Sequence, residues 1–429
     1  MSTLHRKRHN SFMYKNFFLK KHDSEGSTLG WTVASGTLYS VTSLVFLMVV
    51  SHRLGDFWSN IYSIGMMIAL QILTVGRFSV RNFQVSDVED KYSFKEYLSF
   101  RIITCFLAVI VAAIWIPLGG YSGNTAIIIG AFCVYRIAES FSDLFEGLYQ
   151  QKHRLDISGK SQFAKNLVML ITFSVLVLTT GNLVFSALVL AAVSVLLLFI
   201  VDGPIVKEFA TCGFDFSIRK MWGLCRGCFS LFVSSFMYIY INNSPKYAIE
   251  SLEGEDGVGV AKFSMLFMPT FVIELLAGFT LRAWLLKMAS CRKDKDYKGL
   301  RKLIFKQLVV ISVITVLAML GIYFLGGWAL SLIYGTDLHG YEIINVLLML
   351  SGGLGAVYAL FENVVTIYRK QQFSIIINVV AAVTALVLVT VLTAKYYMLG
   401  ATIGFVAANL VRTLGYVLLA MVCIIRENK

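Results

Sequence analysis

Long apolar runs without a charged residue dominate the pattern of hydrophobic and polar positions along the chain. A membrane-spanning helix needs about 20 mostly apolar residues. Seven charge-free runs approach or exceed that length: 29–50, 57–76, 102–120, 227–245, 307–325, 343–361 and 371–394. Three further apolar runs contain isolated charges: 124–148, 263–285 and 398–425.

One charge-free run, residues 166–201, is too long to be a single span. The polar break Thr179-Thr180-Gly181-Asn182 inside it predicts a tight turn between two helices. The pattern therefore predicts an all-α polytopic membrane protein with about twelve transmembrane helices joined by short loops.

Composition supports this prediction. Hydrophobic residues make up 57% of the 429 residues and charged residues 15%, whereas soluble domains are about half apolar and about a quarter charged. A soluble chain of this length has too little core volume for so much apolar surface. This excludes an ordinary soluble enzyme, a disordered chain and a nucleic-acid-binding domain.

The net charge of +13 has an explanation other than nucleic acid. With the N-terminus placed in the cytoplasm, thirty of the 38 Lys and Arg residues fall in cytoplasmic tails and loops, including the segments 79–101 and 150–165. Four fall in external loops: Arg53, Lys246, Lys262 and Lys395. Because cytoplasmic loops carry the excess of Lys and Arg, both termini are predicted to be cytoplasmic.

A weak internal repeat indicates two halves. Asp90-Lys91-Tyr92 follows the second span, and the similar Asp294-Lys295-Asp296-Tyr297 follows the eighth, roughly half the chain later. We therefore predict a cytoplasmic tail at 1–28, a first six-helix bundle at 29–210 and a second at 211–429.

The fourth span contains the densest group of charges. Arg136, Glu139, Asp143 and Glu146 follow one another at intervals of three or four residues, which places them on one helical face. Ionisable groups in a span are costly when they face lipid, so this face should line a watery interior. A structural Arg136–Glu139 pair is the alternative interpretation.

Other spans carry single candidates. Arg77 and Arg282 end the second and eighth spans and either face a cavity or extend to the membrane interface. Arg412 lies in the middle of the last span, with no acidic residue in its own helix. Glu274 follows Pro269 in the eighth span, and this proline predicts either a hinge or a static bend. Intramembrane arginines suit an anionic substrate, and the carboxylates suit proton or sodium coupling.

Motifs for catalysis are absent from the sequence. It contains no HExxH, Walker A, GxGxxG or GxSxG pattern, and the CxxC at Cys225 and Cys228 has no partner motif for zinc. We therefore expect a transporter without catalytic residues, a metal or another cofactor.

Three passages resemble bacterial polysaccharide flippases. They are Gly76-Arg77 followed by Val80-Arg81-Asn82-Phe83-Gln84-Val85-Ser86-Asp87, Tyr135-Arg136-x-x-Glu139 followed by Ser142-Asp143, and Leu332-x-Tyr334-Gly335-x-Asp337. On these residues the chain resembles Wzx-like members of the multidrug/oligosaccharidyl-lipid/polysaccharide exporter superfamily, over about 30–425.

The resemblance implies a MATE-like fold of two six-helix bundles around a central cavity, in the bacterial cytoplasmic membrane. It implies alternating access that moves an undecaprenyl-diphosphate-linked oligosaccharide from the inner to the outer leaflet, among membrane lipids and polysaccharide assembly machinery. The arginines would contact diphosphate or acidic sugar: Arg77, Arg136, Arg282 and Arg412. The coupling candidates would be Glu139, Asp143 and Glu274.

Three other functions compete with this interpretation. A MATE-type, cation-coupled exporter of cationic drugs would share the fold but favour an acidic, aromatic cavity. A membrane glycosyltransferase or polymerase would need a larger external loop with catalytic residues. A non-transporting scaffold of a glycan assembly complex is compatible with the sequence.

Overall fold

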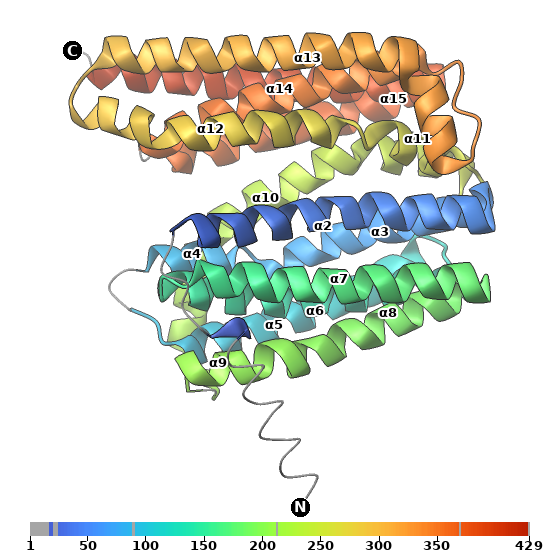
Figure 1. Ribbon diagram of the computed structural model, residues 1–429, viewed down its shortest axis with the longest axis horizontal. Helices are drawn as coiled ribbons and strands as arrows, with labels where there is room; N and C mark the ends of the chain where they lie inside the picture. The colour runs from blue at the N-terminus through green and yellow to red at the C-terminus, as the bar shows by residue number, and fades with distance from the viewer. Residues whose placement is uncertain (1–16, 20–24, 88–90, 212, 369, 428–429) are drawn as a thin grey trace, which may run out of the picture. The chain divides into compact units, whose positions relative to one another are not determined.

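The computed structural model describes residues 17–19, 25–87, 91–211, 213–368 and 370–427, apart from a few side chains within helices. All regular structure in these ranges is helical (Figure 1). The elements are α2 (Glu25–Leu54), α3 (Asp56–Arg77), α4 (Val80–Ser86), α5 (Phe94–Leu118), α6 (Gly123–Gln151), α7 (Leu155–Thr180), α8 (Leu183–Leu197), the π-helix η1 (Leu198–Asp202), α9 (Gly203–Phe209), α10 (Ile218–Glu253), α11 (Gly259–Phe267), α12 (Thr270–Lys293), α13 (Tyr297–Tyr334), α14 (Glu342–Ile367), the short 3-10 helix η2 (Gln371–Phe373) and α15 (Ser374–Glu427).

Eleven helical stretches within the described ranges are long and apolar enough to cross a membrane. The last of them, α15, has 54 residues and is interrupted at Tyr397, where φ is 52° and ψ is −131°. Because α15 contains two spans, the described residues hold twelve crossings. The chain is thus a multi-pass, all-α membrane protein, as the hydropathy pattern predicted.

The chain forms two compact units. The first consists of Met1–Arg53 with Ile68–Phe232, and the second of Leu54–Met67 with Val233–Lys429. Helices α3 and α10 each contribute one part to each unit. The division of the chain into two six-helix bundles, 29–210 and 211–429, stays a prediction.

The turn predicted inside residues 166–201 is present and has a clear local cause. Gly181 ends α7 in the left-handed conformation, with φ of 61°, which glycine adopts without steric cost. Asn182 then caps α8, because its side-chain oxygen accepts a hydrogen bond from the Phe185 backbone N–H. One glycine and one asparagine thus reverse the chain.

The two arms of α15 fold back on each other at Tyr397. The Asn378 amide donates a hydrogen bond to the Tyr416 hydroxyl across the arms, at 3.3 Å. Glycines permit this close approach, because a Cβ at Gly404 would lie 2.7 Å from the Val389 Cα. α15 is therefore a helical hairpin that contributes two spans.

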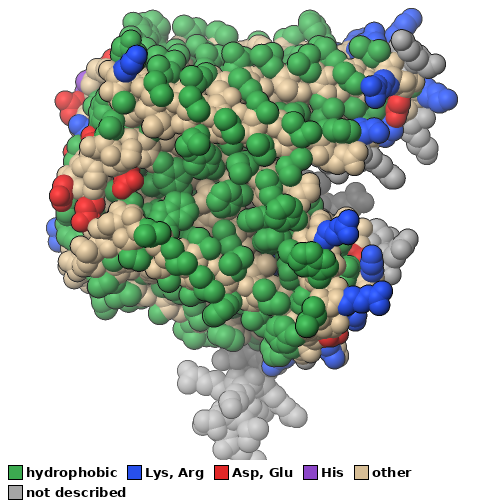
Figure 2. Space-filling model, turned by 180° about the vertical axis from the view of Figure 1, so that it is seen from behind, with side chains coloured by type: hydrophobic (Ala, Val, Ile, Leu, Met, Phe, Trp, Pro, Cys, Tyr) green, Lys and Arg blue, Asp and Glu red, His purple; other side chains and the backbone are tan. Residues whose placement is uncertain are grey.

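Large apolar side chains remain exposed along the helices (Figure 2). On α13, for example, Leu317, Phe324 and Trp328 are all strongly exposed. In water such continuous apolar surface would drive association, whereas lipid solvates it. Figure 2 shows Lys and Arg mainly at the margins of this face, whereas hydrophobic side chains cover its middle.

Several helices begin earlier than the apolar runs indicated. α5 starts at Phe94 and α7 at Leu155, so Arg101, Lys160 and Lys165 lie in helices and are buried. Their assignment to cytoplasmic loops was wrong. Hydropathy marks only the apolar centre of a span, and it does not register a buried charge that has an acidic partner inside the protein.

The packing of α15 gives a test with a matched control. We expect Gly404→Ala to destabilise the protein by about 1–3 kcal/mol, because the added methyl meets the backbone of the opposite arm. Gly321→Ala in α13 should be neutral or slightly stabilising, since nothing lies within 4 Å of its Cβ position and alanine favours helix.

Both variants can be compared by thermal unfolding of purified protein in detergent. A thiol-reactive dye will report the exposure of Cys105, Cys133 and Cys228, which are buried in the folded protein. An unchanged midpoint for Gly404→Ala would contradict the close approach of the two arms.

Candidate functional site

One face of α6 carries the charges of the first unit. Arg136, Asp143 and Glu146 are buried, and Glu139 is half-buried. All four side chains point into the unit, as their spacing predicted, since each one pairs with a neighbour inside it. The interior of the first unit is therefore polar along several successive turns of α6.

Arg77 and Arg136 share a carboxylate of α6. Arg77 Nη2 lies 2.8 Å from Glu139 and its Nε 3.8 Å from Asp143. Arg136 Nη1 lies 2.5 Å from the other Glu139 oxygen and donates a hydrogen bond to the Tyr39 hydroxyl at 3.0 Å. Both alternatives from the sequence thus hold in part, because Arg136 and Glu139 form a pair and Glu139 also lines a cavity.

Two further arginines complete this network, and the sequence reasoning missed them as site residues. Arg101 Nη2 lies 3.2 Å from Asp143, and its Nη1 donates to the Gly76 carbonyl at 2.6 Å. Arg81 Nη1 lies 2.7 Å from Glu146 and 3.7 Å from Asp143. Both arginines had been counted among cytoplasmic loop residues, so position along the chain gave no signal for these pairs.

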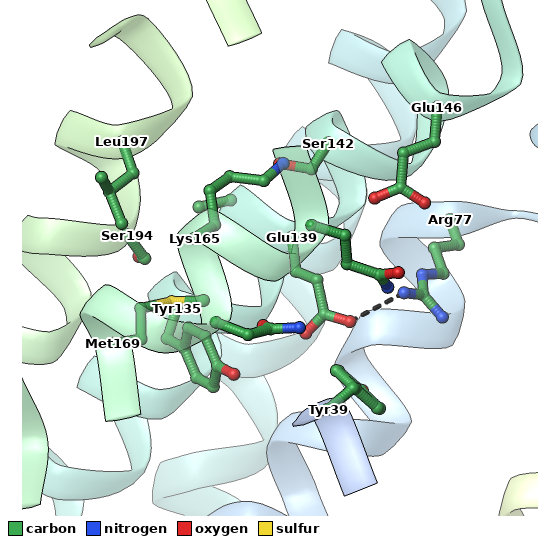
Figure 3. Close-up of a pocket in the computed structure, with 13 residues that line it drawn as sticks. Tyr39, Arg77, Tyr135, Glu139, Ser142, Glu146, Lys165, Met169, Ser194 and Leu197 are labelled. Carbon is green, nitrogen blue, oxygen red and sulfur yellow. Dashed lines mark hydrogen bonds and ion pairs between the residues drawn. The ribbon is translucent and has the colours of Figure 1, made fainter. Parts of the chain in front are cut away.

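A cavity of about 40 Å³ opens beside the network (Figure 3). That is room for about three water molecules. Figure 3 shows the Glu139 carboxylate directed at Arg77, with Tyr39 next to the pair. The cavity is lined by Tyr39, Arg77, Tyr135, Ala138, Glu139, Ser142, Glu146, Gln162, Lys165, Asn166, Met169, Ser194 and Leu197.

A second buried ion pair borders the cavity, and the sequence reasoning missed this one as well. Lys165 of α7 lies 2.7 Å from Asp202. The hydroxyls of Ser142 and Ser161 donate to the same carboxylate at 2.9 and 2.7 Å. Asp202 is the last residue of η1, and π-helical turns often occur at functional sites.

The first unit carries more positive than negative charge in this interior. The cations are Arg77, Arg81, Arg101, Arg136 and Lys165, and the carboxylates are Glu139, Asp143, Glu146 and Asp202. The formal excess of this network is one positive charge, and the cavity lining itself is balanced, with Arg77 and Lys165 against Glu139 and Glu146.

Arg412 is the central charge of the second unit. It is almost completely buried and lies over the rings of Tyr358 and Tyr238, at 4.2 and 5.0 Å from their centroids. Its Nη2 donates to Asn409 Oδ1 at 2.7 Å. Among the described residues, Nε and Nη1 have no hydrogen-bond partner.

Glu274 of α12 lines two cavities near Arg412, of about 10 and 190 Å³. Helix α11 ends at Phe267 and α12 begins at Thr270, so the helix is interrupted at Pro269. The interruption lies where Pro269 led us to predict either a hinge or a static bend. The role of Pro269 as a hinge stays a prediction. Arg282 lies in α12, but its side chain is outside the described part of the chain.

The predicted residues therefore form two groups. Arg77, Arg136, Glu139 and Asp143 meet in the first unit, and Glu274 and Arg412 lie near each other in the second. Within the described ranges, no three His, Cys, Asp or Glu side chains are arranged to hold a metal ion.

Known proteins share this fold. No protein-family model matches the chain. The capsular polysaccharide biosynthesis protein CapF of Staphylococcus aureus is 23% identical over 358 residues, which cover 83% of this chain and 89% of CapF. The lipid II flippase MurJ in an inward closed conformation superposes with a TM-score of 0.69 at 13% identity, over 93% of this chain and 90% of MurJ.

An inward-facing multidrug resistance MATE family transporter of the MOP superfamily superposes with a TM-score of 0.65 at 11% identity, over 90% of this chain and 94% of the transporter. These similarities confirm the MATE-like fold. A relative named for capsular polysaccharide biosynthesis agrees with the resemblance to polysaccharide flippases.

The arginines of the network in the first unit differ in burial, so their contributions to stability should differ. We expect Arg101→Met to lower the free energy of unfolding by about 3–5 kcal/mol, because it removes the nearest cation from the buried Asp143 carboxylate and one of the two side-chain donors to the Gly76 carbonyl. Arg77→Met should cost much less, since the Arg77 side chain is 36% exposed.

The dye-based unfolding assay in detergent measures both effects. Equal losses of stability in the two variants would contradict the different burial of the two arginines.

Proposed function

We propose that this protein is a flippase that moves a lipid-linked oligosaccharide from the inner to the outer leaflet of the bacterial cytoplasmic membrane. The proposed carrier lipid is undecaprenyl diphosphate, and the proposed pathway is surface polysaccharide biosynthesis. The main supporting observation is the cavity in the first unit, which is lined by charged and polar side chains, including Arg77 and Lys165, and lies inside membrane-spanning helices.

The physical problem of such transport matches these features. A phosphorylated glycan head group cannot cross bare hydrocarbon, because each polar group would lose its hydrogen bonds to water. A polar path with guanidinium groups replaces part of that hydration and offers bidentate contacts to phosphate or carboxylate. The lipid tail can stay in the bilayer, and no covalent step is required.

The carboxylates provide candidates for coupling to a proton or sodium gradient. Glu139 and Asp143 share Arg77 as a partner in the first unit, and Glu274 lines the two cavities near Arg412 in the second. Protonation of Glu139 would weaken its attraction to Arg77 and Arg136 and so loosen contacts between helices. We propose Glu139 and Glu274 as the principal coupling residues, because each lines a cavity.

The drug-exporter alternative fits the fold equally well, since a multidrug resistance MATE transporter is among the structural neighbours. Its cargo would be cationic, however, and the charge excess in the first unit is positive. In the second unit, Arg412 lines a cavity together with the opposite charge of Glu274. The positive excess in the first unit favours the flippase proposal.

A leaflet assay tests the proposal. In a strain that lacks the gene, lipid-linked oligosaccharide should disappear from the outer leaflet, and the wild-type gene should restore it. We expect Arg136→Ala and Arg412→Ala to reduce restoration at least about tenfold, because each removes a charge-assisted contact in a dry environment. Impermeant labelling of the glycan on intact cells measures the effect.

Arg426→Ala serves as the control, since Arg426 is exposed at the end of α15. Full glycan display by both arginine variants at normal expression would show that these arginines do not contribute to transport. Unchanged glycan in the deletion strain, together with drug resistance on overexpression, would replace the flippase by the drug exporter.

A further inference from the structure

The unsatisfied donors of Arg412 point to a ligand. A guanidinium group has five N–H donors, and Asn409 accepts from only one nitrogen of this side chain. Burying N–H groups of a charged side chain without acceptors costs free energy. Arg412 lines the smaller cavity of the second unit, so an acceptor that enters there can reach it.

Two aromatic rings lie beside this guanidinium. Tyr238 and Tyr358 are roughly parallel, with an interplanar angle of 25°, and both line the cavity of about 190 Å³. By the same measure as for the first cavity, that volume holds about fifteen water molecules, which is enough room for a sugar ring. The C–H face of a sugar ring packs well on the face of an electron-rich aromatic ring.

Small residues create this space. The remaining lining of the larger cavity contains no side chain bigger than leucine and is made by Ala277, Gly278, Leu281, Gly355, Ala356 and Ala359, apart from Glu274. Gly355 is required for the position of Glu274, because a Cβ there would lie 2.8 Å from the Glu274 carboxylate. The cavity thus has a carboxylate, two aromatic rings and smooth apolar walls.

Hydrogen-bonding groups suited to sugar hydroxyls surround the smaller cavity. Asn242, Ser351 and Asn409 line it together with Glu274. Amides and hydroxyls both donate and accept, and the carboxylate accepts from hydroxyl groups. This mixture is less suited to a cationic ligand, because Arg412 would repel it.

The charge balance limits the anion to a single carboxylate. Arg412 is the one cation among the described residues that line these two cavities, and Glu274 is an opposing anion. A diphosphate carries more negative charge and would need further cations to offset its loss of water. One planar carboxylate matches one guanidinium through two parallel hydrogen bonds.

We propose that the cavities around Arg412 form a subsite for one sugar ring that carries a carboxylate, with the carboxylate on Arg412 and the ring against Tyr238 or Tyr358. The subsite deepens the proposed function and rests on it, since the sugar would belong to the transported glycan. It assigns the diphosphate to other residues.

A binding experiment with simple probes tests the subsite without transport. Purified full-length protein in nanodiscs is titrated with the methyl glycosides of glucuronic, galacturonic and mannuronic acid, and binding is followed by saturation-transfer NMR. Their neutral hexose counterparts, acetate and inorganic pyrophosphate serve as comparison ligands. We expect at least one uronide to bind at least about tenfold more tightly than its neutral counterpart and than acetate.

Variants locate the interaction. Arg412→Gln should abolish the preference for the acid, and Arg412→Lys should retain part of it as a second charged variant. Tyr358→Leu should weaken binding of the acid and of the neutral sugar alike, whereas Tyr358→Phe keeps the ring and should bind both. Arg426→Gln is the matched control on the same helix, and the dye-based unfolding assay checks folding of each variant.

Three results would overturn the subsite: no uronide preferred over its neutral counterpart, a preference that survives in Arg412→Gln, or acetate or pyrophosphate binding at Arg412 as tightly as the best uronide. The leaflet assay reports separately on the flippase proposal. Normal glycan display with no uronide preference rejects the subsite alone, and absence of a transport defect in the deletion strain rejects the flippase.

Discussion

The pairing of buried charges controls the structure of the first unit. Three carboxylates of α6 receive arginines from α3, the following short helix α4, and α5. Lipid provides little hydrophobic force to associate helices, so polar contacts and close packing must determine which helices meet. Because each arginine comes from a different helix, the α6 carboxylates determine how four helices assemble, and the cavity forms where this pairing leaves space.

The second unit stabilises its buried central charge in a different way. Its central arginine is held by an amide and two tyrosine rings rather than by a salt bridge among the described residues. Cation–π contact stabilises the charge but does not use the N–H donors. The first unit thus satisfies most of its charges internally, whereas the second leaves binding capacity available. A transporter needs both properties, a rigid interior and a site that is incomplete without its cargo.

The sequence predicted the parts of this arrangement that depend on local pattern. The twelve crossings, the turn at Gly181 and the shared face of Arg136, Glu139, Asp143 and Glu146 all follow from hydropathy or helical periodicity. Their partners Arg81 and Arg101 do not, because these arginines lie at the ends of apolar runs, where loop and helix look alike. The contact of Tyr238 and Tyr358 with Arg412 could not be predicted either, since only packing between helices distant in sequence brings their rings to Arg412.

The hairpin at Tyr397 has a mechanical consequence. A single non-helical residue joins two long arms whose backbones approach closely at Gly404. The connection is therefore short, and close packing opposes sliding of one arm along the other. Any displacement of one arm must carry the other along as a single lever. Arg412 lies in the second arm, so a displacement of the first arm would also displace its guanidinium group.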